Sequence, residues 1–112
     1  MEKFVKIFSA LSDENRLRIY LLLLQSELCV CELVNILEME QSRISHSLRI
    51  LKEADLINNH KVGKWNIYST NQIIKENKII QGLEDELKLS ARDLNNLGKC
   101  KKENIREKSR CN

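Results

Sequence analysis

The spacing of apolar residues changes near residue 56 from that of a helix to that of a strand. This change constrains the fold more than any other feature of the sequence. Residues 41–54 repeat apolar side chains at helical spacing, with polar and basic side chains on the other faces. Residues 65–69 alternate apolar and polar side chains as a strand does, and a basic turn that contains Gly63 precedes them. The sequence therefore predicts a helix followed by a small basic hairpin.

Three more helices are predicted ahead of this point. Residues 2–11 form an amphipathic helix, and Ser12 is the expected N-cap of a second, well buried helix that ends near Gln25. Residues 29–38 form a third helix, and a brief turn separates it from the fourth. Two short helices joined by a tight turn and followed by a basic wing are the pattern of a winged helix-turn-helix.

Helical periodicity returns after the hairpin. In residues 71–98 apolar side chains recur every seven positions, while Glu76 and Ser90 interrupt the companion positions. The seven-residue set is Ile73, Ile80, Leu87 and Leu94. This pattern predicts one long helix that stops at Gly98 and pairs with the first helix and with a second copy of the chain. The expected architecture is mainly α with a small β-hairpin, as a homodimer through the first and last helices.

The chain divides into two units of different composition. Residues 1–98 are the expected dimerising domain, and residues 99–112 form a C-terminal tail with six Lys or Arg and two Glu. The tail carries a local net charge of +4, compared with +3 for the whole chain of 112 residues. It contains Cys100 and Cys111 and is expected to be loosely ordered.

Several functional classes are disfavoured. The longest apolar run, Leu21–Leu24, is far too short to cross a bilayer, and no signal peptide is recognised, so a cytoplasmic protein is expected. The sequence shows no Cys-x-x-Cys motif, phosphate-binding loop or βαβ pattern, so we predict that it is not an enzyme. A pure protein-interaction module stays open as an alternative to DNA binding.

The fourth helix carries the side chains that we expect in the major groove of double-stranded operator DNA. Serine bonds phosphate or base edges, and arginine pairs bidentately with guanine. Residues 41–64 hold a local net charge of +3, whereas residues 71–98 are near −1. Wing lysines are expected on phosphate or in the minor groove, and Trp65 is expected to anchor the wing. The predicted DNA-binding residues are Ser42, Arg43, Ser45, His46 and Arg49 in the helix and Lys61 and Lys64 in the wing.

Four cysteines in a reducing compartment favour metal binding or redox chemistry over structural disulfides, and Cys29 and Cys31 are one residue apart. The sequence resembles the ArsR/SmtB family of metal-responsive repressors over roughly residues 4–90. The stretches that carry the resemblance are ALSDENRLRIY (10–20), ELCVCEL (27–33), SRISHSLRILKEADLI (42–57) and KVGKWNIYS (61–69). The resemblance implies a homodimer that represses a resistance operon without metal and leaves the DNA when metal binds.

The resemblance assigns Cys29 and Cys31 to the metal box of the family. Val34 stands where the best-known arsenic sensors have a third cysteine, so the third ligand is expected from Cys100 or, alternatively, Cys111. Trivalent arsenic is the expected inducer, because arsenite takes three thiolates. Cd(II), Pb(II) and Zn(II) stay open as inducers, as does a thiol redox switch. The His/Asp/Glu zinc site of related sensors is not expected, since the last helix has no histidine.

The two neighbouring cysteines predict a mechanism for the switch. Both are expected at the start of a helix, where the backbone dipole favours thiolate. On a regular helix, residues i and i+2 lie about 200° apart, so the two sulfurs would face different ways. Binding both to one ion is then expected to distort the first turn and to displace the neighbouring DNA-reading helix.

Overall fold

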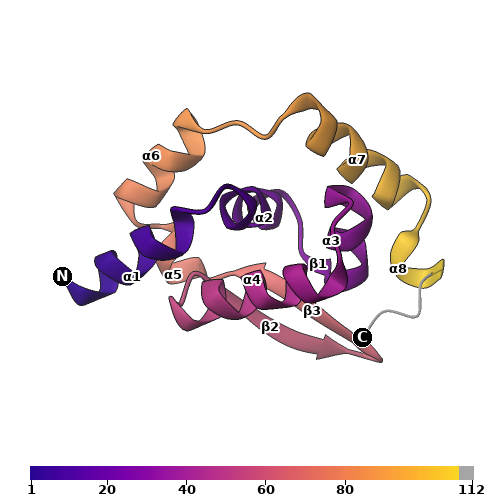
Figure 1. The fold of residues 1–112 in the computed structure, drawn as a ribbon, viewed down its shortest axis with the longest axis horizontal. Helices are drawn as coiled ribbons and strands as arrows, with labels where there is room; N and C mark the ends of the chain where they lie inside the picture. The colour runs from indigo at the N-terminus through magenta and orange to yellow at the C-terminus, as the bar shows by residue number, and fades with distance from the viewer. Residues whose placement is uncertain (109–112) are drawn as a thin grey trace.

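The computed structural model describes residues 1–108 as a mainly helical fold with one small antiparallel sheet (Figure 1). The predicted fold class is confirmed. The elements in chain order are α1 (Glu2–Leu11), α2 (Glu14–Gln25), β1 (Leu28–Cys29), α3 (Val30–Leu37), α4 (Gln41–Glu53), β2 (Ile57–Val62), β3 (Trp65–Thr70), α5 (Gln72–Lys75), α6 (Lys78–Glu86), α7 (Ala91–Lys102) and α8 (Ile105–Lys108).

The junction between α1 and α2 differs by one residue from the prediction. Asp13, and not Ser12, is the N-cap of α2, and its carboxylate accepts the backbone N–H of Arg16 at 3.0 Å. The hydroxyl of Ser12 instead donates to the carbonyl of Ser9, at the end of α1. Aspartate and serine cap helices equally well, so the sequence did not discriminate between two adjacent candidates.

The helix-turn-helix consists of α3 and α4. Helix α3 ends at Leu37, its C-cap Glu38 has a left-handed φ of 56°, and α4 begins at Gln41. The apolar stripe of α4 faces the core as predicted, with Ile44, Leu48 and Leu51 buried. Burial of this stripe sets the rotation of α4 and leaves its polar face toward solvent.

The sheet contains the predicted hairpin and one strand that was not predicted. Strands β2 and β3 pair antiparallel across a turn at Gly63, whose φ of 60° favours glycine. Strand β1 pairs with the other edge of β3, which places Cys29 opposite Ile67. A strand of two residues is too short to show an alternating pattern, and β1 was therefore assigned in part to the third helix.

The prediction of a single long helix over residues 71–98 is wrong. The segment forms α5, α6 and α7, and each begins at a residue whose side chain accepts a backbone N–H, namely Asn71, Asn77 and Ser90. The interruptions of the heptad pattern at Glu76 and Ser90 are helix boundaries, at the C-cap of α5 and the N-cap of α7. Figure 1 shows that α6 and α7 form an arch that passes over α2 and ends beside α3.

Residues 99–102 continue α7 and residues 105–108 form α8, which corrects the predicted stop at Gly98 and, for residues 99–108, the predicted loose tail. Gly98 lies inside α7 with open space around it, where glycine costs a helix only about 1 kcal/mol. Helix α8 then packs against α3. The predicted boundary at residues 98 and 99 therefore falls within a helix. Cys111 lies outside the described residues.

The core lies between α2, α3, α4 and the sheet, and it includes Leu22, Leu33, Leu56 and the cysteines Cys29 and Cys100. Within residues 1–108, no helix is both long enough and apolar enough to cross a membrane.

Candidate nucleic-acid interface and ligand site

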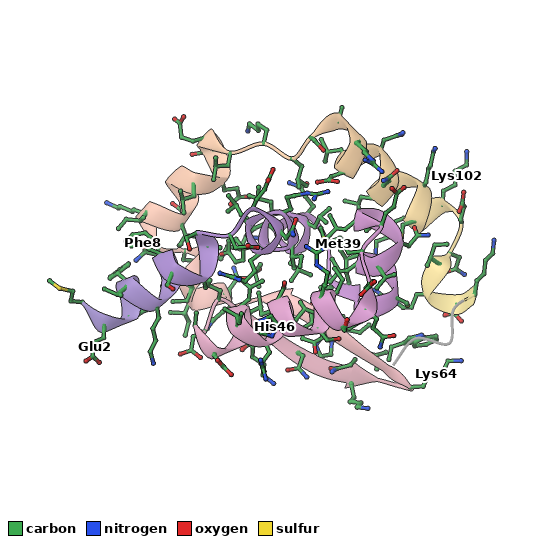
Figure 2. The ribbon with its side chains drawn as sticks, viewed as in Figure 1. Glu2, Phe8, Met39, His46, Lys64 and Lys102 are labelled. Carbon is green, nitrogen blue, oxygen red and sulfur yellow. The ribbon has the colours of Figure 1, made fainter. Side chains whose placement is uncertain are left out.

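The polar face of α4 presents every predicted recognition side chain to solvent. The exposed set is Ser42, Arg43, Ser45, His46 and Arg49. Arg49 and His46 lie one turn apart, and Nη2 of Arg49 is 2.9 Å from Nδ1 of His46, so a neutral imidazole accepts from the guanidinium. Figure 2 shows His46 on α4 and Lys64 at the tip of the hairpin, on the same side of the molecule. These positions suit one helix in the major groove with a wing beside it.

The wing, which is the hairpin of β2 and β3, is hydrogen-bonded to α8 through Trp65. Lys61 and Lys64 are exposed, and Nζ of Lys64 lies 5.3 Å from the centroid of the Trp65 ring. The indole Nε1 of Trp65 donates to the backbone carbonyl of Arg106 on α8, at 3.1 Å. Trp65 is therefore an anchor, as expected, and its partner is a segment that the sequence did not place near the wing.

Cys29 and Cys31 lie together, which overturns the predicted geometry. Cys29 is the N-cap of α3, with an extended backbone at φ −93° and ψ 170°, so it is outside the regular helix. Its Sγ lies 3.0 Å from Sγ of Cys31 in the first turn. The expected angle of a regular helix does not apply, because the pairing of Cys29 with Ile67 holds its backbone in the sheet. No unwinding of α3 is needed to place both sulfurs on one ion.

A buried carboxylate lies next to this pair. Glu32 is 2% exposed and accepts the backbone N–H of Cys29 at 3.0 Å. Arg106 donates to the same oxygen from Nε at 3.0 Å and from Nη2 at 2.8 Å, and Lys101 lies 3.6 Å from the other oxygen. Burial alone would raise the pKa of Glu32, but the hydrogen bonds from Cys29 and Arg106 and the charge of Lys101 hold that pKa below its ordinary value.

Sequence reasoning missed Glu32, Lys101 and Arg106. A signal for Glu32 was present, because Cys29-Val30-Cys31-Glu32 has the spacing of a capping box with cysteine in place of serine or threonine. No comparable signal marks Lys101 or Arg106. They lie more than sixty residues further along the chain, and only the path of α7 and α8 brings them to the start of α3.

Cys100 is fully buried on the inner face of α7. Burial, with the nearby charges of Glu32 and Cys29, raises the pKa of its thiol to about 11. Cys100 is thus near the pair but held as a neutral thiol. Among residues 1–108, no group of three or more His, Cys, Asp or Glu side chains is arranged to hold a metal ion. The described residues bring Cys29 and Cys31 together, and the assignment of Cys100 as third ligand stays a prediction.

Comparison with known proteins matches residues 13–59, which contain the helix-turn-helix, to a family described as bacterial regulatory proteins of the arsR family. The chain is 40% identical over 72 residues to the arsenical resistance operon repressor of Bacillus subtilis, and the match covers 63% of this chain and 69% of that protein. The chain belongs to the ArsR family. Members of this family are DNA-binding regulators, which confirms the prediction that the chain is not an enzyme.

Two further relatives of this ArsR-family chain extend the comparison. A cadmium resistance regulator homologue, CadC, of Staphylococcus aureus is 46% identical over 65 residues, 57% of this chain and 54% of that protein. The chain thus spans about half the length of this curated relative. The solved structure of reduced HlyU from Vibrio cholerae has a TM-score of 0.66 and 32% identity, over 76% of this chain and 88% of that one. The relatives support an ArsR-type winged helix, and their names point to different inducers.

Proposed function

We propose that this chain is a repressor that binds operator DNA in the cytoplasm as a homodimer and is released when trivalent arsenic binds Cys29 and Cys31. The observation that carries the proposal is the 3.0 Å separation of the two sulfurs at the start of α3. Two adjacent sulfurs suit a soft, thiophilic ion and do not suit a hard one. The first turn of a helix also favours the thiolate form that such an ion binds.

The third thiolate is proposed to come from Cys100 or Cys111. The thiol of Cys100 is buried, with a pKa raised to about 11, so an ion must displace its proton. Three thiolates make an arsenite site, and four make a tetrahedral site for Cd(II) or Zn(II). Cd(II), Pb(II) and Zn(II) are therefore the alternative inducers, and the cadmium resistance relative supports testing them.

The position of Cys29 provides a route from ligand to DNA. Cys29 is the last residue of β1, where it pairs with Ile67 of the wing strand, and it is also the N-cap of α3. An ion on this residue acts on the wing and on the helix-turn-helix at the point where they join. A shift from nearly full to nearly no occupancy of the operator requires the ion to favour the released state by about 5 kcal/mol.

The homodimer is proposed from exposed apolar side chains on the helices away from the wing. Val5 and Phe8 of α1 are 59% and 49% exposed, and Ile79 of α6 is 49% exposed. Figure 1 shows α1 and α6 at the same end of the molecule. A two-fold pair joined there would carry two recognition helices, as a palindromic operator requires.

The proposal is tested by titrating arsenite into the protein bound to a labelled palindromic operator, while thiolate charge-transfer absorption is recorded. The wild type should release the operator as the absorption band grows. Cys29→Ser and Cys31→Ser should bind the operator like wild type and stay bound in arsenite. Cys100→Ser and Cys111→Ser in parallel identify the third ligand, and Cd(II), Pb(II) and Zn(II) titrations identify the inducer. If arsenite released Cys29→Ser from the operator as it releases the wild type, the proposal would be wrong.

A further inference from the structure

Arg106 contacts both the cysteine turn and the wing. Its guanidinium donates twice to Glu32 Oε1, at 3.0 and 2.8 Å, and once to the backbone carbonyl of Glu27, at 3.2 Å. Glu32 in turn accepts the backbone N–H of Cys29 at 3.0 Å. The carbonyl of Arg106 accepts the indole N–H of Trp65, at 3.1 Å. One residue on α8 therefore connects the start of α3 with the first residue of β3.

The place of Arg106 in the chain makes this connection sensitive to a ligand. Arg106 lies between Cys100 and Cys111, the two candidates for the third thiolate. Cys100 is fully buried on α7, which leads into α8, so a movement of its sulfur onto an ion would shift the segment that carries Arg106.

The far end of the connection reaches a predicted DNA contact. Trp65 begins β3, and the ammonium of Lys64 lies 5.3 Å from its ring. The wing tip is exposed at Val62, Gly63 and Lys64, and Trp65 pairs with Val62 beside this turn, so the indole N–H bond to α8 holds the wing near its tip. If α8 moves and this bond is lost, the wing is free to change its angle to α4.

We propose that Arg106 is a positioning residue that couples ligand binding at Cys29 and Cys31 to the wing, through Glu32 on one side and Trp65 on the other. This inference rests on the proposed function and adds a path of communication to it. Two discrete arrangements follow: with α8 docked, the wing is held for DNA, and with α8 displaced by the third thiolate, it is not.

The surroundings of Glu32 allow Arg106 to be replaced without an unpaired buried charge. Lys101 remains 3.6 Å from the second oxygen of Glu32 and supplies a counter-charge from α7. Lys101 does not replace the coupling, since its ammonium is a point charge without the fork of a guanidinium, and its hydrogen bond at 3.4 Å goes to the carbonyl of Glu27. Arg106→Ala should therefore fold while the α8 connection to the cysteine turn is lost.

The test measures coupling as the ratio of operator dissociation constants with and without saturating arsenite, in the same variant. Saturation is verified by the charge-transfer band. The wild type should give a ratio of at least about 100, and Arg106→Ala should give a ratio of about 3 or less. This difference corresponds to about 2 kcal/mol or more in coupling free energy. Lys102→Ala, an exposed cation in the same segment, is the matched control and should keep the wild-type ratio.

Trp65 is the single tryptophan of the chain, so its fluorescence emission reports on the wing directly. A purely structural role of Arg106 would not change how this emission responds to arsenite. In wild type, arsenite should shift its emission as the indole leaves the carbonyl of Arg106. In Arg106→Ala that shift should be absent or already present without arsenite. Arg106→Lys, which keeps the charge and loses the fork, should restore only part of the ratio.

The outcomes separate the inference from the proposed function. A wild-type ratio in Arg106→Ala at saturating arsenite overturns the coupling role and leaves the sensing role intact. A wild type that neither binds nor responds to arsenite or to Cd(II), Pb(II) and Zn(II) overturns both. If Arg106→Ala loses its cooperative melt, Trp65→Phe tests the other end of the path: a near-unity ratio supports the coupling, and a wild-type ratio overturns it.

Discussion

Arg18 on α2 holds Asp93 on α7 in a bidentate ion pair, with Nε and Nη2 each 2.9 Å from a carboxylate oxygen. Asp93 is 1% exposed, whereas the side chain of Arg18 is 30% exposed. The pair attaches the arch of α6 and α7 to the core, and Asn96 adds a bond of 2.9 Å to the carbonyl of Ile36. The two partners are unequal, since only the carboxylate is cut off from water.

The first prediction follows from this asymmetry. Arg18→Met leaves a buried, charged carboxylate without its partner and should lower the free energy of unfolding by about 3 kcal/mol. Asp93→Asn should cost less, because Arg18 can be solvated. Arg92→Ala removes an exposed ion pair with Glu38 and should cost about 0.5 kcal/mol or less. Urea denaturation of the three variants tests this order, and equal losses would contradict it.

The second prediction concerns acid stability. Burial would raise the pKa of Glu32, but hydrogen bonds from Cys29 and Arg106 hold it below its ordinary 4.5. As pH falls below about 4.5, the unfolded chain binds a proton that the folded chain does not, so the free energy of unfolding falls. Glu32→Gln should flatten this loss in urea melts across the acid range. Glu107→Gln, an exposed carboxyl on α8, is the control, and an unchanged slope in Glu32→Gln would show that another group causes the loss.

The third prediction concerns Cys100. Its thiol is fully buried, with a pKa raised to about 11, so little thiolate exists at about pH 8. Alkylation of Cys100 by iodoacetamide, followed by peptide mass spectrometry, should be slower in the folded protein than in urea by at least about 100-fold. Displacement of α7 by a bound ion would expose the thiol unless the ion takes it. Rapid labelling of Cys100 in the folded, ligand-free protein would show that α7 does not stay docked over this thiol.

The fourth prediction concerns the wing. Lys61 and Lys64 are exposed on the hairpin and are expected to contact phosphate or the minor groove. Each change to Ala should weaken binding to operator and to unrelated DNA alike, and should reduce the slope of log affinity against log salt by about 1. Lys88→Ala, in the connection between α6 and α7, should leave both quantities unchanged. Fluorescence anisotropy at several salt concentrations measures them, and a loss confined to one sequence would indicate base contact instead.

The fifth prediction concerns the proposed dimer. Phe8 of α1 is 49% exposed, and its replacement by Lys should place a charge in the proposed interface (Figure 2). Sedimentation should show a shift toward monomer and a matching loss of operator affinity. Val62→Lys, at a 47% exposed apolar position in the wing, should leave the association state unchanged. A monomeric wild type would reject the dimer, and a dimeric Phe8→Lys would place the interface elsewhere.

Local patterns of residues are sufficient to predict the helix-turn-helix and the wing. Ile44, Leu48 and Leu51 recur at helical spacing, and their burial alone settles which side chains of α4 face solvent. The turn at Gly63 needs a left-handed residue, and the strands on either side of it pair as the predicted hairpin. The family resemblance, which rested on these stretches together with residues 10–20 and 27–33, was confirmed.

The geometry of the candidate ligand site depends instead on contacts between elements that are far apart in the chain. The sulfurs of Cys29 and Cys31 are adjacent because Cys29 pairs with Ile67, a partner that lies far along the chain and leaves no local pattern. The contact of Arg106 with Glu32 and Trp65 depends on the path of α7 and α8, which helix caps and the buried Asp93 direct. Spacing along a sequence reports which residues share a face of one element, whereas contacts between elements are set by packing of the whole chain.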